Sequence, residues 1–213
     1  MLERLAGSRV VAGFSVEKVE HALPLTKALL AGGIDAIELT LRTPAAMDGL
    51  KAICGEVPGM LIGVGTILTP ELAREVKAAG ADFGVAPGMN PRVVRAAQEA
   101  GLPFAPGICT PSDLEAAIEL GCRFVKFFPA EPAGGIPYLR SMSAPYKHLG
   151  IQYFPLGGLN AQNMLEYLQE SNVPTIGGSW IVKQELVDKA DWAGITARAA
   201  EVIKILKKDS RNE

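Results

Sequence analysis

A single lysine lies in the middle of a short apolar run, residues 124–129 (FVKFFP). An aromatic-rich run of this length that is closed by proline predicts a buried strand. Burial disfavours the charged ammonium, and a neutral amine is a nucleophile that forms Schiff bases with carbonyl compounds. Lys126 is therefore a candidate catalytic nucleophile. The alternative is a lysine at a strand end, with a buried stem and an ammonium that reaches water.

A second strand candidate carries polar residues on one of its faces. In residues 37–42 (IELTLR), alternation places Glu38, Thr40 and Arg42 together, opposite three aliphatic side chains. A half-exposed surface strand would show the same pattern. In an α/β barrel both faces of the sheet are covered, so the polar face must line the interior, where a carboxylate and a guanidinium need partners. Residues 63–66 (GVGT) similarly end in a hydroxyl, that of Thr66.

Two glycine pairs follow the last two strand candidates. Gly157-Gly158 comes after residues 152–156, and Gly177-Gly178 precedes Ser179. Loops at these places in barrel enzymes commonly bind phosphate through backbone N–H groups. Tight turns also use glycine pairs, so the signal is weak in isolation. The sequence contains neither a Walker motif nor a dinucleotide-binding fingerprint.

Short apolar strands and amphipathic helices alternate along the whole chain. The expected strands are residues 10–14, 36–41, 61–66, 83–87, 103–108, 124–128, 152–156 and 175–178. The expected helices are residues 19–31, 70–79, 91–100, 112–120, 161–169 and 192–207. This alternation predicts an α/β fold, a small (β/α)₈ TIM barrel formed by a single domain over residues 1–213. An open doubly wound sheet is the structural alternative, because periodicity does not separate the two.

Composition narrows the class of protein. The chain has 213 residues, 48% of them hydrophobic, and a net charge of −2, which argues against a nucleic-acid partner. The three cysteines form no CxxC pair and suit a reducing cytoplasm. The N-terminus predicts no signal peptide, and no stretch reaches the roughly 18 apolar residues of a membrane span. The two histidines lie far apart without ligand spacing, so we expect no metal.

Several segments together resemble a known enzyme family. They are ELTLRT (38–43), GVGT (63–66), PGICT (106–110), KFFPAE (126–131), GG (157–158) and GGSW (177–180). The set is similar to the family of 2-keto-3-deoxy-6-phosphogluconate (KDPG) aldolase and 4-hydroxy-2-oxoglutarate (KHG) aldolase, in order and over nearly the whole chain. The resemblance implies a class I, metal-free aldolase on a (β/α)₈ barrel, with no cofactor, and usually a homotrimer.

The resemblance also implies a role for each motif residue. Lys126 would be the Schiff-base lysine and Glu38 the general acid/base. Arg42 and Thr66 would hold the pyruvate carboxylate, and Phe128 would pack on the substrate. The remaining implied contacts are with the phosphate, from Gly157, Gly158, Gly178 and Ser179. The substrate would be a small, phosphorylated oxo acid that releases pyruvate.

The chain departs from the family pattern at two places in the expected site. Leu156 stands before the glycine pair where threonine is usual, and residues 12–14 (AGF) replace a Pro-Val-Ile strand. Both changes bear on the identity of the aldehyde half of the substrate. Two alternatives therefore stay open: a barrel enzyme for another phosphosugar acid, such as 2-keto-3-deoxy-6-phosphogalactonate, and a non-catalytic sugar-phosphate binding protein.

Overall fold

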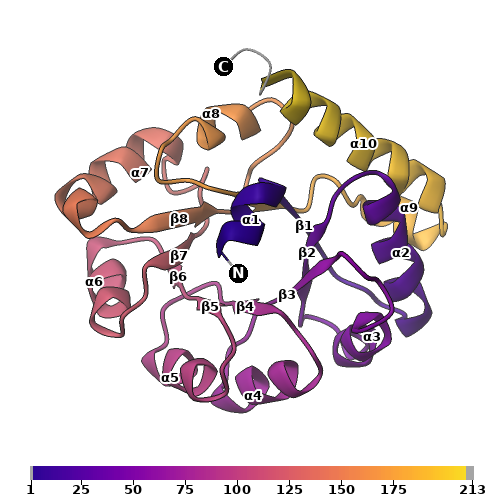
Figure 1. Ribbon diagram of the computed structural model, residues 1–213, viewed down its shortest axis with the longest axis horizontal. Coiled ribbons are helices and arrows are strands. Elements are labelled where there is room, and N and C mark those ends of the chain that lie inside the picture. The colour runs from indigo at the N-terminus through magenta and orange to yellow at the C-terminus, as the bar shows by residue number, and fades with distance from the viewer. Residues whose placement is uncertain (1, 210–213) are drawn as a thin grey trace.

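The computed structural model describes residues 2–209 as parallel strands that alternate with helices. Figure 1 places the strands around the centre of the molecule and the helices around its outside, except α1, which lies over the centre. The strands are β1 (Val10–Phe14), β2 (Ala36–Thr40), β3 (Leu61–Gly65), β4 (Phe83–Val85), β5 (Phe104–Ala105), β6 (Gly107–Ile108), β7 (Phe124–Phe127), β8 (Gln152–Pro155) and β9 (Ile176–Gly178). The strand positions agree with the sequence prediction to within a few residues.

The helices include all six that the sequence predicts. They are α1 (Leu2–Ser8), α2 (Val19–Ala31), α3 (Ala46–Ile53), α4 (Pro70–Ala78), α5 (Pro91–Glu99), α6 (Pro111–Glu119), α7 (Gly135–Ser143), the 3₁₀ helix η1 (Ala144–Leu149), α8 (Met164–Leu168), α9 (Gln184–Asp188) and α10 (Trp192–Asp209). Helices α4, α5 and α6 begin alike, because Thr69, Asn90 and Thr110 cap them with a side-chain oxygen and proline follows.

Helices α1, α3, α7, η1 and α9 are not among the predicted helices, although α3 has buried residues at helical spacing, Ala46, Gly49, Leu50 and Ile53. Helix α7 begins with Gly135 and contains Pro137, and its N-cap Gly134 has a φ of 117°. Helix α9 has only five residues. Such short or glycine- and proline-containing helices form because tertiary packing outweighs local propensity. No helix within residues 2–209 is both long and apolar enough to cross a membrane.

The strands hydrogen-bond as two curled parallel sheets. The larger has the order β5-β4-β3-β2-β1-β9 and the smaller the order β6-β7-β8. Only Pro106 separates β5 from β6; it has no N–H to donate, although its carbonyl accepts the Lys126 N–H at 2.9 Å. The strand predicted over residues 103–108 is therefore divided in two. The prediction of an α/β fold with a parallel sheet is confirmed, while the ladders form two sheets rather than one closed ring of eight strands.

Apolar side chains on the inward face of the strands, several of them near the amino ends, form a cluster that we call the floor. Helix α1 lies over this end of the ring in Figure 1 and contributes the fully buried Leu5. The floor consists of Leu5, Val11, Ala36, Leu61, Phe83, Val85, Ala105, Phe124, Phe154 and Leu156. A separate, larger cluster packs between the strands and the outer helices. The floor closes the interior from below and supports the residues nearer the carboxyl ends of the strands.

Candidate active site

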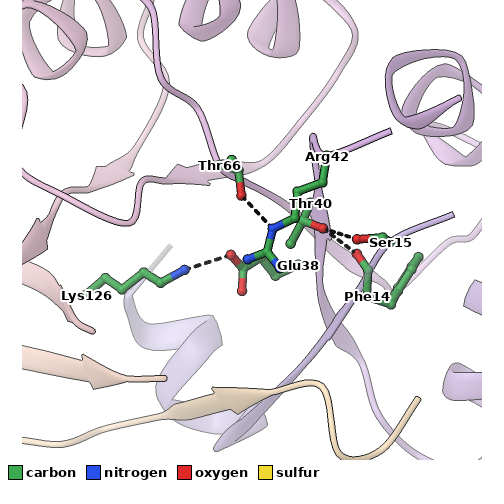
Figure 2. A network of polar contacts seen from close by, with 7 residues as sticks. All are labelled: Phe14, Ser15, Glu38, Thr40, Arg42, Thr66 and Lys126. Atoms are coloured by element: carbon green, nitrogen blue, oxygen red, sulfur yellow. Dashed lines mark hydrogen bonds and ion pairs between the residues drawn. The ribbon is translucent and has the colours of Figure 1, made fainter. Parts of the chain in front are cut away.

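Lys126 and Glu38 meet inside the ring of strands. Lys126 lies on β7 and Glu38 on β2, and they are 4% and 2% exposed, respectively. The lysine Nζ is 2.9 Å from Glu38 Oε1, a contact visible in Figure 2. The Nζ also lies 5.1 Å from the centre of the Phe128 ring. The lysine does not reach water at a strand end; it is held beside a carboxylate that can take or return a proton.

Glycines on the two neighbouring strands lie beside the Glu38 carboxylate, and the one on β3 makes room for it. Gly13 pairs with Glu38 across β1 and β2, and a Cβ at Gly13 would lie 3.5 Å from Glu38 Oε2. At Gly65, near the end of β3, a Cβ would lie only 2.0 Å from Glu38 Oε1. Any side chain at position 65 would therefore displace the carboxylate from its place beside Lys126.

Arg42 and Thr66 lie above this pair, at the carboxyl ends of β2 and β3. The Arg42 Nε donates to Thr66 Oγ1 at 3.4 Å (Figure 2). Arg42 is exposed to solvent. Thr66 has a φ of 64°, in the left-handed region that residues other than glycine rarely adopt. Such strain is typical of functional sites and here aims the hydroxyl at Arg42. A guanidinium fork and a hydroxyl at the same edge form a suitable site for a carboxylate.

A second polar contact lies at the same end of the strands. Ser15 Oγ and Thr40 Oγ1 are 2.5 Å apart, and Thr40 also donates to the Phe14 carbonyl at 3.2 Å (Figure 2). Thr40 is buried and Ser15 is half-buried. We call the polar side chains at this end of the ring the mouth; they are Ser15, Glu38, Thr40, Arg42, Thr66 and Lys126.

These residues surround a cavity of about 480 Å³. Its lining is Gly13, Phe14, Ser15, Glu38, Thr40, Arg42, Lys126, Phe128, Leu156, Gly157, Gly178, Ser179, Val182 and Gln184. Most of the predicted site residues therefore converge on one cavity. The two exceptions are Thr66, which is hydrogen-bonded to the lining residue Arg42, and Gly158, which is exposed next to the lining residue Gly157. A cavity of this size accommodates a small sugar acid.

The glycine turn after β8 has a backbone that favours glycine. Gly157 and Gly158 have φ values of 96° and 85°. Gly178 is the last residue of β9 and Ser179 follows it; both line the same cavity as Gly157. The four residues predicted to hold a phosphate thus lie in two adjacent loops at the mouth of the cavity.

Several residues that line the cavity are not among the predicted site residues. Ser15 follows β1 directly, so the rule that polar residues at strand ends build the site would have found it. Val182 and Gln184 belong to the start of α9 and its approach, which carry no recognisable signal. Within residues 2–209, no group of three or more His, Cys, Asp or Glu side chains is arranged to hold a metal ion.

The sequence and this geometry both match a known family. The family model described as KDPG and KHG aldolase aligns with residues 1–198. The chain belongs to the KDPG and KHG aldolase family. A KHG/KDPG aldolase from Escherichia coli K12 is 40% identical over 194 residues, 91% of this chain and 90% of that protein. A 2-dehydro-3-deoxy-phosphogluconate aldolase from Dickeya dadantii is 40% identical over 199 residues, 93% of this chain and 92% of that protein.

A solved structure supports the same assignment. The KDPG aldolase from Legionella pneumophila, crystallised with pyruvate captured as a covalent carbinolamine, superposes with a TM-score of 0.88 at 40% identity. The match covers 93% of this chain and 95% of that one. The predicted family is confirmed, and so is the predicted activity of a lyase that works as a class I Schiff-base aldolase.

Proposed function

We propose that this aldolase cleaves KDPG, KHG or both, to pyruvate and an aldehyde, glyceraldehyde 3-phosphate or glyoxylate. The observation that carries the proposal is the buried contact of 2.9 Å between Lys126 and Glu38 at the base of the cavity. A lysine in this setting can become a neutral nucleophile by passing a proton to the carboxylate beside it.

In the proposed reaction the Lys126 amine attacks the substrate ketone to give a carbinolamine, which loses water to form an iminium. The iminium is the electron sink for cleavage. Glu38, directly or through water, takes the proton of the C4 hydroxyl, and the electrons of the C3–C4 bond pass into the iminium as the aldehyde leaves. Glu38 then returns a proton to C3 of the enamine. Water hydrolyses the resulting iminium, releases pyruvate and restores the Lys126 amine.

We assign substrate binding to the residues above the pair. Arg42 and Thr66 would hold the pyruvate carboxylate, because a guanidinium recognises a planar carboxylate bidentately. Phe128 would pack on the pyruvate carbons next to the Lys126 nitrogen, in keeping with its ring position 5.1 Å from that atom. The exposed position of Arg42 allows the carboxylate to enter from solvent.

We assign the phosphate to the two glycine loops. Gly157, Gly158, Gly178 and Ser179 would supply backbone N–H groups and one hydroxyl, which bind an anion without needing a cation. Gly157 and Gly178 are half-buried and Gly158 and Ser179 are exposed, which suits the solvated end of a phosphorylated substrate.

The wider assembly is part of the same proposal. We infer that the two sheets act as one (β/α)₈ barrel, that residues 1–213 form a single domain, and that three copies assemble into a homotrimer. The proposed enzyme works in the cytoplasm on a small molecule, without metal, cofactor or nucleic acid.

A trapping experiment tests the mechanism. Borohydride reduction in the presence of pyruvate should add one pyruvate-derived mass, and peptide mapping should locate it at Lys126. Lys147 and Lys183 are exposed and act as internal controls in the same digest. An adduct on another lysine, or none at all, contradicts the mechanism. Activity should also survive a chelator, and loss of activity that a divalent ion restores would contradict the metal-free proposal.

One feature of the cavity favours a second substrate. Leu156 lines the cavity where the family resemblance leads us to expect threonine, so a hydroxyl able to contact the sugar-acid chain is replaced by an apolar side chain. Relaxed selection of the C4 epimer would admit 2-keto-3-deoxy-6-phosphogalactonate. Pyruvate release from both epimers and from KHG, assayed side by side, decides between these substrates.

A further inference from the structure

Two consecutive carbonyl groups of the turn after β8 accept hydrogen bonds from the loop that follows β7. The Leu156 carbonyl accepts the Ala130 N–H at 2.8 Å, and the Gly157 carbonyl accepts the Glu131 N–H at 3.0 Å. In a trans peptide the C=O and the next N–H point in opposite directions. The N–H groups of Gly157 and Gly158 therefore face away from residues 130 and 131.

The next peptide of the turn is fastened in the same way. The Gly158 carbonyl accepts the Asn163 side-chain amide at 3.4 Å, so the Leu159 N–H points away from Asn163. The directions of three successive N–H groups, of Gly157, Gly158 and Leu159, are thus set by the hydrogen bonds that the preceding carbonyl groups accept. Residues that fix those carbonyls fix the donors available to an anion.

Glu131 is itself held by a buried phenol. Tyr167, on α8, is fully buried, and its hydroxyl donates to Glu131 Oε1. The stem of Glu131 also packs against the turn, because a Cβ at Gly158 would lie 2.5 Å from the Glu131 Cβ. Glu131 lies between β7 and α7, and Tyr167 lies on α8, so this contact joins the segments that precede and follow β8. Helices α7 and α8 are neighbours on the outside of the ring in Figure 1.

We propose that Glu131 and Tyr167 are positioning residues that hold the 156–159 turn in its anion-binding geometry and so set the preference for phosphorylated over unphosphorylated substrate. The inference rests on the proposed function, since it concerns the phosphate end of the same cavity. Neither residue lines the cavity, so neither is placed to touch the reacting atoms.

The phenol is well suited to a permanent anchor. Burial, followed by the hydrogen bond to Glu131, raises the pKa of Tyr167 above its ordinary value, so the hydroxyl remains a donor throughout the neutral range. The anchored carboxylate is an acceptor only, and Tyr167 holds it on the side of the loop that faces α8. The turn is thus positioned by a contact whose phenol keeps its proton near neutral pH.

Tyr167→Phe removes the hydroxyl and leaves the ring in place. We expect KM for KDPG to rise roughly 2- to 13-fold, the equivalent of one hydrogen bond, with kcat and the KM for KHG nearly unchanged. The matched control is Tyr153→Phe, because Tyr153 is also buried (1% exposed) but its hydroxyl has no hydrogen-bond partner among the described residues. Tyr153→Phe should leave both KM values unchanged.

A second pair of variants addresses Glu131 directly. Glu131→Ala should raise KM for KDPG as Tyr167→Phe does, whereas Glu131→Gln keeps an oxygen acceptor for the phenol and should stay within about twofold of the wild type. Inorganic phosphate provides an independent probe. The inhibition constant of phosphate against KDPG cleavage should rise in Tyr167→Phe by the same factor as KM.

The outcomes separate this inference from the proposed function. Wild-type protein that traps no pyruvate and cleaves neither substrate overturns the proposed function. Wild-type protein that cleaves both, with Tyr167→Phe raising the two KM values equally or matching Tyr153→Phe, overturns the positioning role alone. A selective loss for KDPG that Glu131→Gln avoids supports it.

Discussion

The inward side of the strands differs sharply between its two ends. The floor is built entirely from apolar side chains, whereas the mouth, two to six residues beyond the first floor residue of the same strand, contains a buried ion pair and a set of hydroxyls. On β7, Phe124 belongs to the floor and Lys126 to the mouth; on β2, Ala36 and Glu38 divide in the same way. Both halves share one backbone geometry and one alternation of side chains.

The two ends make different energetic contributions. Burying one large apolar side chain in the floor stabilises the fold by about 1.5–3 kcal/mol. The ion pair at the mouth adds little net stability, because the cost of removing two charges from water offsets their attraction. The floor therefore carries the stability of the interior, and the mouth is free to keep the groups that the chemistry needs.

The largest effect should come from the carboxylate of the mouth. Glu38→Gln preserves shape but removes proton transfer, so we expect kcat to fall roughly 10²- to 10⁴-fold with the fold and borohydride trapping retained. Glu170→Gln is the matched control, since Glu170 forms its ion pair with Arg140 outside the cavity. A kcat that barely moves in Glu38→Gln would show that Glu38 is only the structural partner of Lys126.

A second test compares two glycines on β3 that point to the same side. At Gly65 a new Cβ would lie 2.0 Å from Oε1 of Glu38, a mouth residue; at Gly63 it would lie 2.1 Å from the ring of Phe83, a floor residue. Gly65→Ala should lower kcat about 10²-fold by moving the carboxylate. Gly63→Ala should instead destabilise the fold by about 1–3 kcal/mol, the usual cost of overpacking, and leave kcat nearly unchanged.

Thermal unfolding and steady-state kinetics on both variants decide this comparison. If the two alanines lower stability and kcat to the same extent, the floor and the mouth are not functionally separate. The opposite pattern, with activity lost at Gly63 alone, would place the sensitive part of the interior in the floor.

Much of this division could be predicted from the sequence. A polar residue on the inward face of an apolar strand, as at Glu38 and Lys126, has one explanation once both faces of the sheet are covered. The 2.9 Å distance between these two residues could not be predicted from the sequence, because it depends on the order and stagger of strands that are 88 positions apart in the chain. The contribution of α9 to the cavity depends on tertiary packing in the same way, whereas the division of the fifth strand at Pro106 follows from the missing N–H of proline.

The smallest effect should appear at the boundary of the two regions. Leu156 belongs to the floor and also lines the cavity, and it packs so closely that a Cβ at Gly177 would lie 2.9 Å from its Cδ2. Leu156→Thr adds a hydroxyl that could bond the sugar-acid chain. We expect the ratio of kcat/KM for KDPG to that for its galactonate epimer to change by roughly 2- to 13-fold, the range of one hydrogen bond.

Leu156→Val is the control that isolates the hydroxyl, because valine and threonine have nearly the same shape. Both variants lose apolar volume in the floor, so both should be less stable than the wild type by about 1–3 kcal/mol. Only threonine should alter the epimer ratio. If valine shifts the ratio equally, cavity volume rather than a hydrogen bond selects the substrate. If neither shifts it, Leu156 acts purely as a floor residue beneath the Gly157-Gly158 turn, and the phosphate contacts alone determine which epimer is preferred.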